Sequence, residues 1–380
     1  MAEPTDTAAT SKGESLPWTE KYRPSTLDDV VAHEEIIGTL RRLMNSDSMP
    51  HLLLYGPPGT GKTTTIKACA HYLYGKARML ANVLEMNASD DRGIDVVRQQ
   101  IREFCSTSSI FSMAGPMTSS TAAPSASGAN EAGGEKRPNA PLRPSHSFKL
   151  VVLDEADHMS HDAQAALRRI IEKYTRNARF CILCNHINRI IPALQSRCTR
   201  FRFAPVRKAA MLPRLRQVAE GEGVACTAEG LAAAFHLSQG DLRRCLNTMQ
   251  SAALAAGEIT AEAVYRATGN PTPAEVAAIV ADALSGDFAS CWPKLEVAVT
   301  DKGVSVMDLL REIHPIVMAM DLPQDCKCFL LTKLSDLEYY SAGGAREGVG
   351  LSGILGAFQL VKEAVTQRKP INEVVAAFVR

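Results

Sequence analysis

A glycine-rich run that ends in a lysine and a threonine is the strongest chemical signal in the sequence. Residues 56–63 read Gly-Pro-Pro-Gly-Thr-Gly-Lys-Thr, directly after the apolar segment 52–55 and before a helical pattern. This is the GxxxxGK[ST] phosphate-binding loop in the strand–loop–helix context that it requires. Glycines let backbone N–H groups close around phosphates, and the start of the helix adds a positive dipole. We therefore predict an ATP site formed by Gly56, Pro57, Pro58, Gly59, Thr60, Gly61, Lys62 and Thr63, with Lys62 on the β- and γ-phosphates and the Thr63 hydroxyl on Mg²⁺.

A second motif supplies the carboxylates that such a site needs. The apolar segment 150–153 runs directly into Asp154-Glu155-Ala-Asp157. An acid at the end of a strand holds Mg²⁺, and a neighbouring acid orients and deprotonates the attacking water. We assign Asp154 to the metal and Glu155 to the general base. Carboxylates at a strand end are otherwise solvated caps, but the presence of the phosphate loop makes the catalytic interpretation the stronger one.

Two further polar positions are less specific. Asn185 follows the apolar segment 181–184, where an amide can position the lytic water or the γ-phosphate, although an isolated asparagine is more often a turn residue. Arg197 opens the stretch 197–216, which has seven Lys or Arg and no Asp or Glu. Such a stretch is a solvated face, a nucleic-acid patch, or the source of an arginine for a neighbouring active site.

The elements that must position these residues are strands alternating with helices. Apolar strand patterns cover 51–55, 83–86, 150–153 and 180–184, and helical patterns cover 62–74, 94–104 and a segment with Ala163, Leu167, Ile170, Ile171 and Tyr174 on one face. This alternation predicts an α/β fold with a parallel sheet. Beyond Pro205 we expect only helices, short ones to about residue 268 and longer ones after it.

These patterns divide the chain into a disordered tail (1–15), an α/β ATPase domain (16–206), a small helical domain (207–269) and a helical C-terminal domain (270–380). Within the ATPase domain, 23 of the 36 residues from Ser112 to Ser147 are Ser, Ala, Gly or Pro. Such a composition buries too little apolar surface to offset the entropy of ordering, so we expect a disordered insertion at 112–147.

Composition limits the class of protein. The chain has 42 Lys and Arg and 41 Asp and Glu, a net charge of +1, which excludes a uniformly basic DNA-coating protein. No secretory signal or apolar run of the ~18 residues that span a membrane is apparent, so we expect an intracellular protein. The ten cysteines are too dilute for a disulfide scaffold. We interpret Cys181 and Cys184 as small apolar residues of a buried strand rather than as metal ligands.

The motifs together resemble a known family. The small subunits of replication factor C, the eukaryotic AAA+ clamp loader, are similar in 20–24 (Glu-Lys-Tyr-Arg-Pro), the phosphate loop, 87–95, 154–157, 196–198 (Ser-Arg-Cys) and 240–244 (Gly-Asp-Leu-Arg-Arg). The resemblance runs from about Leu16 to the C-terminus, apart from the insertion. Residues 199–203 and 330–339 look most like the branch called subunit 5.

The resemblance implies roles that the residue types alone do not. It implies that Thr19, Arg23 and Val31 lie by the adenine and sugar, that Asn185 is sensor 1 and Arg243 sensor 2, and that Arg197 is an arginine finger acting on the adjacent subunit. It also implies that Arg92 and Arg98 face the DNA backbone. Ile110 and Phe111 match a segment that meets the sliding clamp, although a core pair is the commoner interpretation of those residue types.

The family's activity then gives the functional expectation. The chain would be a nuclear ATPase subunit of a hetero-pentamer that opens the sliding clamp, proliferating cell nuclear antigen, and loads it onto primer-template DNA in replication and repair. ATP and Mg²⁺ would be its cofactors, with no membrane partner. Two alternatives remain: another AAA+ DNA-remodelling motor, and a mainly structural or checkpoint subunit that does not hydrolyse ATP.

Overall fold

A computed structural model describes residues 16–46, 49–88, 94–106 and 148–378. The expected tail at 1–15 and insertion at 112–147 lie outside these residues. The described chain divides into two compact units. One contains the residues up to Gly221 together with Phe235–Asn247, and the other contains Glu222–Ala234 together with the residues from Thr248 onward.

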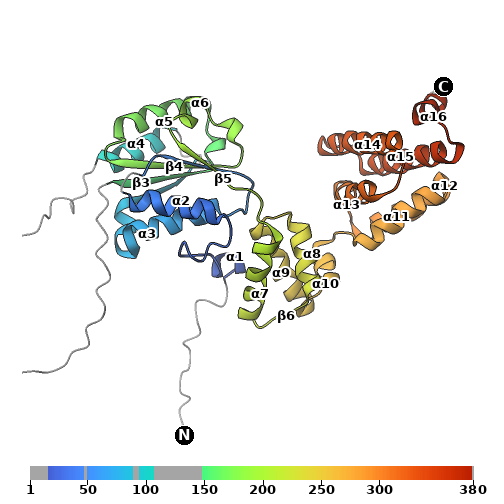
Figure 1. Cartoon of the computed structure of the whole chain (residues 1–380), viewed down its shortest axis with the longest axis horizontal. Coiled ribbons are helices and arrows are strands. Elements are labelled where there is room, and N and C mark those ends of the chain that lie inside the picture. Colours follow the sequence, from blue (N-terminus) through green and yellow to red (C-terminus); the bar gives the residue numbers. More distant parts are fainter. Residues whose placement is uncertain (1–15, 47–48, 89–93, 107–147, 379–380) are drawn as a thin grey trace, which may run out of the picture. The chain divides into compact units, whose positions relative to one another are not determined.

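The first unit is built on a five-stranded parallel sheet (Figure 1). Its strands, in the order β2-β3-β4-β1-β5, are β1 (Leu52–Tyr55), β2 (Val83–Asn87), β3 (Lys149–Asp154), β4 (Ala178–Cys184) and β5 (Thr199–Arg202). Strands β1, β3 and β4 are almost fully buried, because helices cover both faces of a parallel sheet. The predicted α/β fold is confirmed.

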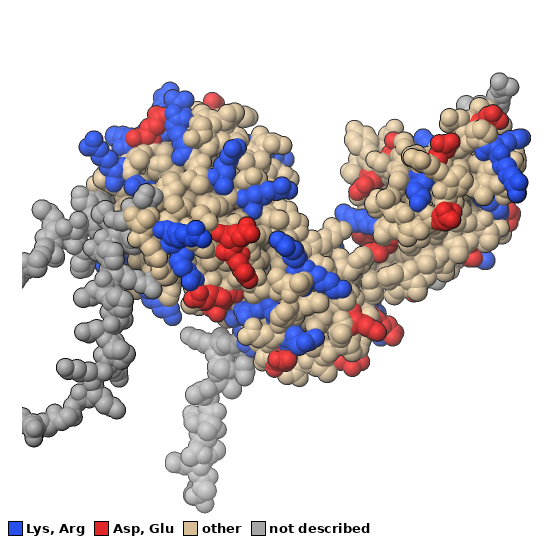
Figure 2. Space-filling view, in the orientation of Figure 1, with Lys and Arg blue, Asp and Glu red and all other residues tan. Residues whose placement is uncertain are grey.

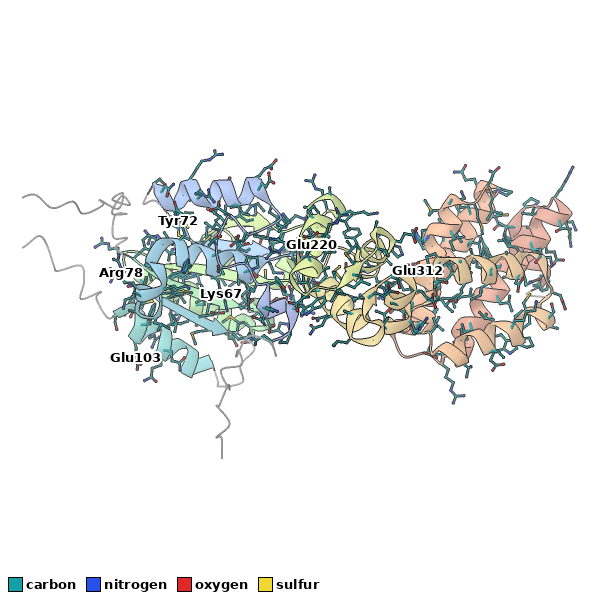
Figure 3. The ribbon with its side chains drawn as sticks, turned by 90° about the horizontal axis from the view of Figure 1, so that it is seen from below. Lys67, Tyr72, Arg78, Glu103, Glu220 and Glu312 are labelled. Carbon is teal, nitrogen blue, oxygen red and sulfur yellow. The ribbon has the colours of Figure 1, made fainter. Side chains whose placement is uncertain are left out.

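Two helical layers enclose this sheet. Helices α2 (Glu34–Asn45) and α3 (Lys62–Asn82) cover one face, and α4 (Ile94–Ser106), α5 (His161–Tyr174) and α6 (Pro192–Gln195) cover the other (Figure 1). The Tyr72 hydroxyl of α3 donates a hydrogen bond of 2.9 Å to the Asn45 amide oxygen of α2, and Figure 3 marks Tyr72 and Lys67 on α3. Gly75 breaks the helical geometry of α3 with a φ of 69°, so the helix continues past its predicted end with a kink.

Strand β5 was not predicted. It pairs only with β1 and therefore forms an edge of the sheet. Thr199, Arg200 and Arg202 are exposed while Phe201 packs against the core. A four-residue edge strand with polar side chains carries no apolar run, and for that reason the sequence pattern did not reveal it.

The segment after Pro205 is almost entirely helical. Its helices are α7 (Lys208–Gly221), α8 (Ala228–Ser238), α9 (Leu242–Ala256), α10 (Ala261–Thr268), α11 (Pro273–Ser285), α12 (Phe288–Lys302), α13 (Val306–Ala319), α14 (Gln324–Ala342), α15 (Glu347–Gln367) and α16 (Ile371–Phe378). The expectation that no strand follows Pro205 is wrong, because Ala225–Cys226 (β6) and Glu258–Ile259 (β7) form a small parallel ladder. Two-residue strands are too short to leave an alternating pattern.

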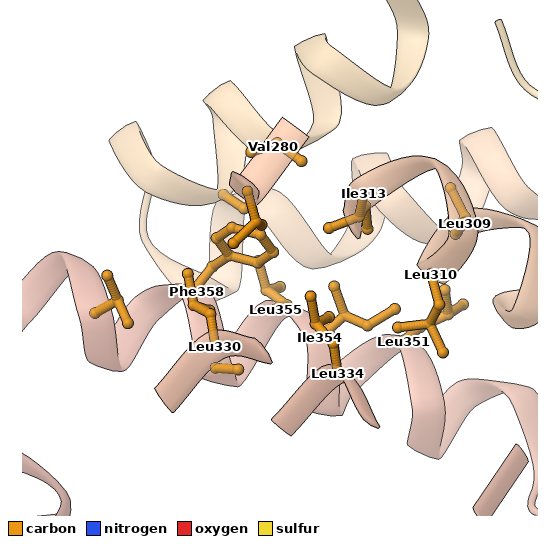
Figure 4. Close-up of a cluster of buried hydrophobic side chains, with 14 of the residues drawn as sticks. Val280, Leu309, Leu310, Ile313, Leu330, Leu334, Leu351, Ile354, Leu355 and Phe358 are labelled. Carbon is orange, nitrogen blue, oxygen red and sulfur yellow. The ribbon is translucent and has the colours of Figure 1, made fainter. Parts of the chain in front are cut away.

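A single apolar core holds α11 to α16 together. Leu330 of α14 and Ile354, Leu355 and Phe358 of α15 are at most 3% exposed and lie side by side in it (Figure 4). The three residues of α15 are spaced by one, three and four positions and therefore lie on one face of the helix. Helix α15 is also long and apolar enough to cross a membrane, but seven of its residues are buried in this core. That burial is typical of a core helix of a globular domain.

Seven of the ten cysteines are buried. All ten are free thiols, and Cys181 and Cys184 are at most 1% exposed on β4. Burial raises the pKa of the Cys184 thiol to about 12, so it stays protonated and unreactive. The interpretation of this pair as strand core is confirmed.

His51, just before β1, is a buried histidine held in its neutral form. Its Nδ1 accepts a hydrogen bond of 3.1 Å from the Phe180 backbone N–H, and its Nε2 lies 3.4 Å from the Thr175 hydroxyl. Burial, and then the nearby Arg179, lower the pKa of His51 to about 4. Because the unfolded chain takes up this proton near pH 6.5, acid favours unfolding over the range between the two pKa values.

We therefore expect His51 to make the protein less stable at acidic pH. Its full contribution is present above pH 6.5 and is lost between about pH 6.5 and pH 4, a decrease of roughly 3 kcal/mol in the free energy of unfolding. Urea unfolding at pH 7.5 and pH 5 measures it. His51→Gln keeps an acceptor for the Phe180 N–H but cannot titrate. The decrease in the free energy of unfolding between these pH values should therefore be smaller in this variant. Equal losses in the two proteins would contradict the prediction.

Candidate functional site

The phosphate loop joins β1 to α3 and depends on glycines for its backbone. Gly56, Gly59 and Gly61 have φ values of 146°, 66° and 95°, a region that residues with a Cβ rarely adopt. A Cβ on Gly56 would lie 1.9 Å from the Phe203 carbonyl oxygen, so that position also has no room for one. Helix α3 begins at Lys62, so its unpaired N–H groups lie at the loop, as an anion-binding site requires.

Lys62 is the only lysine among the residues that line the loop cavity, and it is 8% exposed. Its Nζ donates to the Gly56 carbonyl at 2.7 Å, the Pro57 carbonyl at 2.8 Å and the Asn185 Oδ1 at 2.9 Å. Burial lowers the pKa of Lys62, and Asp154 opposes that shift. The ammonium is therefore a buried cation whose protein partners are three neutral oxygens, which suits a site for a phosphate.

The acidic motif lies directly beside the loop. The Thr63 hydroxyl donates to Asp154 Oδ2 at 2.8 Å, and Asp154 Oδ1 accepts from the Glu155 backbone N–H at 2.9 Å. A hydroxyl and a carboxylate oxygen in contact are the kind of donors that Mg²⁺ prefers, so these residues fit that ion. Among the described residues, no group of three or more His, Cys, Asp or Glu forms a metal site of the protein's own.

Glu155 has a backbone conformation that is uncommon for its residue type. Its φ of 54° lies in the left-handed region, at the point where β3 ends and a short 3₁₀ helix, Ala156–His158, begins. Such a conformation costs about 1–3 kcal/mol, and strain of this kind gathers at functional sites. The half-buried carboxylate lines the cavity next to Asp154.

The topology of the sheet explains why Asn185 reaches the loop. Strand β4 lies between β3 and β1, so the residue after β4 falls between the acidic motif and the phosphate loop. Asp157, which the sequence analysis did not assign to the site, holds this residue in place. Its carboxylate is 5% exposed, and its Oδ2 accepts from the backbone N–H groups of Asn185 at 3.3 Å and His186 at 3.2 Å.

The cavity at the loop has a volume of about 220 Å³ and is lined by segments far apart in sequence. Thr19 and Arg23 line it, as predicted, whereas half-buried Val31 does not belong to its described lining. Arg243 lines it as well. The lining residues that the sequence analysis missed include Tyr22, Pro24, Leu242 and Leu246.

Helix α9 is tied to the loop by its first turn. The Leu242 N–H donates to the Gly59 carbonyl at 3.2 Å, and the Asp241 side chain caps the helix by accepting from the Arg244 N–H at 3.0 Å. A Cβ on Gly59 would lie 1.6 Å from Asp241 Oδ1, so only glycine permits this approach. The contact places Arg243 at the cavity.

Arg197 lies outside the described lining of this cavity. It follows α6, and its guanidinium binds Glu172 of α5 and the Ala193 carbonyl. Arg92, Ile110 and Phe111 lie outside the described residues, and Arg98 is placed on α4 without a described side chain. Figure 2 shows Lys and Arg interspersed with Asp and Glu on the visible face of the α/β part, rather than gathered in one block.

Comparison with known proteins supports the interpretation of this geometry. The model of the AAA family, ATPases associated with various cellular activities, matches residues 52–206, and that of the replication factor C C-terminal domain matches 271–357. Replication factor C subunit 5 of Homo sapiens is 44% identical over 357 residues, which cover 94% of this chain and 95% of that protein. Subunit 5 of Arabidopsis thaliana is 45% identical, with coverages of 91% and 88%.

A solved structure gives a weaker likeness. The Thermotoga maritima RuvB Holliday junction branch migration motor aligns with a TM-score of 0.45 and 14% identity, over 77% of this chain and 85% of that one. Agreement at this level does not bear on function.

Proposed function

Because this chain belongs to the replication factor C subunit family of AAA+ ATPases, we propose that it is an ATP-hydrolysing subunit of a clamp loader. One observation carries the proposal beyond family membership: Lys62, Thr63, Asp154 and Asn185 meet through hydrogen bonds at one edge of the sheet, with Glu155 beside them. A subunit with only a structural or checkpoint role would not need this intact set.

The positions of the site residues support the following roles. Lys62 binds the β- and γ-phosphates, and Thr63 and Asp154 hold Mg²⁺, which would offset the charge of the phosphates when bound. Glu155 accepts a proton from the attacking water, and Asn185 orients that water or the γ-phosphate. Thr19 and Arg23 contact the adenine and sugar, and Arg243 approaches the phosphates from α9. Val31 keeps only the support of the family resemblance.

The remaining assignments concern partners. Arg197 lies outside the described lining of this chain's own cavity, which supports an action on the ATP site of an adjacent subunit. Arg92 and Arg98 as DNA contacts, and Ile110 and Phe111 as clamp contacts, are supported by the family resemblance alone. DNA binding of this kind would be mostly to phosphates, and so blind to base sequence and sensitive to salt.

The domain division also rests on the family resemblance. We assign residues 16–206 to the ATPase domain, 207–269 to the lid and 270–380 to a collar through which the subunits assemble. The two family models lie within the first and third of these ranges. Clamp loading in a eukaryotic cell places the protein in the nucleus.

The partners of the chain in its native cells test the proposal. Purification of the protein with a small affinity tag should recover four related subunits in equal amounts, and the sliding clamp should join them when ATP is present. Subunit masses and their stoichiometry, from intact-complex mass spectrometry, provide the measurement. Recovery of a homo-hexamer would instead support the other AAA+ motor, and a complex without ATPase activity would support a structural subunit.

A further inference from the structure

The carboxylate of Glu172 binds two nitrogens of the Arg197 guanidinium through one oxygen. Glu172 Oε1 lies 3.0 Å from Arg197 Nε and 2.6 Å from its Nη2, while Arg197 Nη1 donates to the Ala193 carbonyl at 2.7 Å. All three nitrogens of the guanidinium are therefore in contact with protein oxygens. The long side chain is held by groups from two different elements, α5 and α6.

This arrangement leaves part of the guanidinium free for a ligand. A guanidinium has five N–H groups, and the three contacts above use one on each nitrogen. One N–H therefore remains on Nη1 and one on Nη2. The Ser196 hydroxyl, at 3.5 Å from Nη1, is too distant to engage the first of them strongly. An N–H on Nη1 and one on Nη2 can together bind a phosphate through two oxygens.

The ion pair contributes little to the stability of the fold. The side chains of Arg197 and Glu172 are 35% and 43% exposed, and exposed pairs are generally worth at most about 1 kcal/mol. Arg168 also contacts Glu172 Oε1, at 3.3 Å, so this carboxylate would keep a cationic partner without Arg197. The specific effect of the contact between Glu172 and Arg197 is that it fixes the direction of the Arg197 guanidinium.

We propose that Glu172 is a positioning residue for the arginine finger. It holds Arg197 by the side formed by Nε and Nη2, so that the two free N–H groups are directed toward a phosphate of the adjacent subunit. This inference rests on the proposed role of Arg197. Pre-orientation matters because a freely rotating arginine must be ordered each time that it acts, and small misplacements of catalytic groups cost up to about 100-fold in rate.

The test uses the assembled complex, in which this chain carries Glu172→Ala, Glu172→Gln, Arg197→Ala or the Glu172→Ala/Arg197→Ala pair. The measured quantity is the part of the steady-state ATPase rate that Arg197→Ala removes. We expect Glu172→Ala to remove about nine tenths of that part through kcat, with KM for ATP unchanged. Glu172→Gln, which keeps the size and one acceptor oxygen, should remove less. The matched control Arg168→Ala, which alters the same ion cluster but not the finger, should change the rate less than twofold.

The double variant separates orientation from a general structural effect. If Glu172 acts through Arg197, the double variant should equal Arg197→Ala alone. A further loss in the double variant, or a full rate in Glu172→Ala, would overturn the inference while leaving the finger assignment intact. If Arg197→Ala does not lower the rate, Arg197 is not the arginine finger, and the inference about Glu172 loses its basis. If Glu172→Ala does not assemble, the same comparison is made with Glu172→Gln.

Discussion

Replacement of Lys62 by alanine is expected to abolish ATP binding by this chain. The buried ammonium is the only lysine cation in the described lining of the loop cavity. Its removal also leaves the Gly56 and Pro57 carbonyls without their hydrogen-bond donor. Each hydrogen bond to a charged group is worth about 1.5–3 kcal/mol, so the loss of two to the phosphates weakens binding by about 100-fold or more. Titration of the purified chain with a fluorescent ATP analogue provides the measurement.

Lys67→Ala is the matched control. Lys67 lies on the same helix, but its ammonium forms an exposed ion pair of 2.6 Å with Glu85 (Figure 3). Its removal should change the dissociation constant for ATP less than twofold. Thermal unfolding of both variants shows whether the fold persists. An affinity of Lys62→Ala within threefold of the wild type would refute the assignment of the phosphate loop.

Replacement of Arg197 by alanine is expected to separate binding from hydrolysis. The side chain lies outside the described lining of this chain's own cavity, so the affinity of the chain for ATP should not change. In the assembled complex, hydrolysis at the adjacent site should fall by about 1,000-fold or more, because arginine fingers stabilise the charge of the transition state to that extent. The total ATPase rate of the complex then falls by the fraction that the adjacent site contributes to it.

Arg200→Ala distinguishes this effect from a loss of surface charge. Arg200 is exposed on β5 only three residues away, and its removal changes the net charge equally. We expect the ATPase rate of that complex to stay within twofold of the wild type. An unchanged rate in Arg197→Ala would show that the finger is another residue. Reduced ATP affinity of the isolated Arg197→Ala chain would show that the residue acts within its own subunit.

Local patterns predicted the centre of the site well. The phosphate loop and the acidic motif each lie in one short segment, and parallel strands bring their carboxyl ends to the same edge of a sheet. Their meeting through Thr63 and Asp154, and with Asn185, therefore follows from the fold class.

The periphery of the site depends on contacts that no local pattern records. Leu242 and Leu246 line the cavity because α9 docks on the loop through Gly59, a contact between residues about 180 apart in the chain. The ion pair between Glu172 and Arg197 likewise joins two elements. In the sequence, the two residues cannot be distinguished from ordinary surface charges. Strand β5 was not predicted because it lies at an exposed edge of the sheet, where its side chains are mostly polar.

The three contacts of Lys62 also set a limit on how the protein responds to nucleotide. A lysine ammonium has three N–H donors, and the Gly56 carbonyl, the Pro57 carbonyl and Asn185 use all of them. Each hydrogen bond from this ammonium to a phosphate therefore requires that one of these oxygens gives up its donor. When that oxygen belongs to Asn185, the side chain that loses its donor belongs to the segment after β4, whose backbone Asp157 holds. By thermodynamic linkage, any partner that shifts this segment changes the affinity for ATP by the same factor as ATP changes the affinity for that partner.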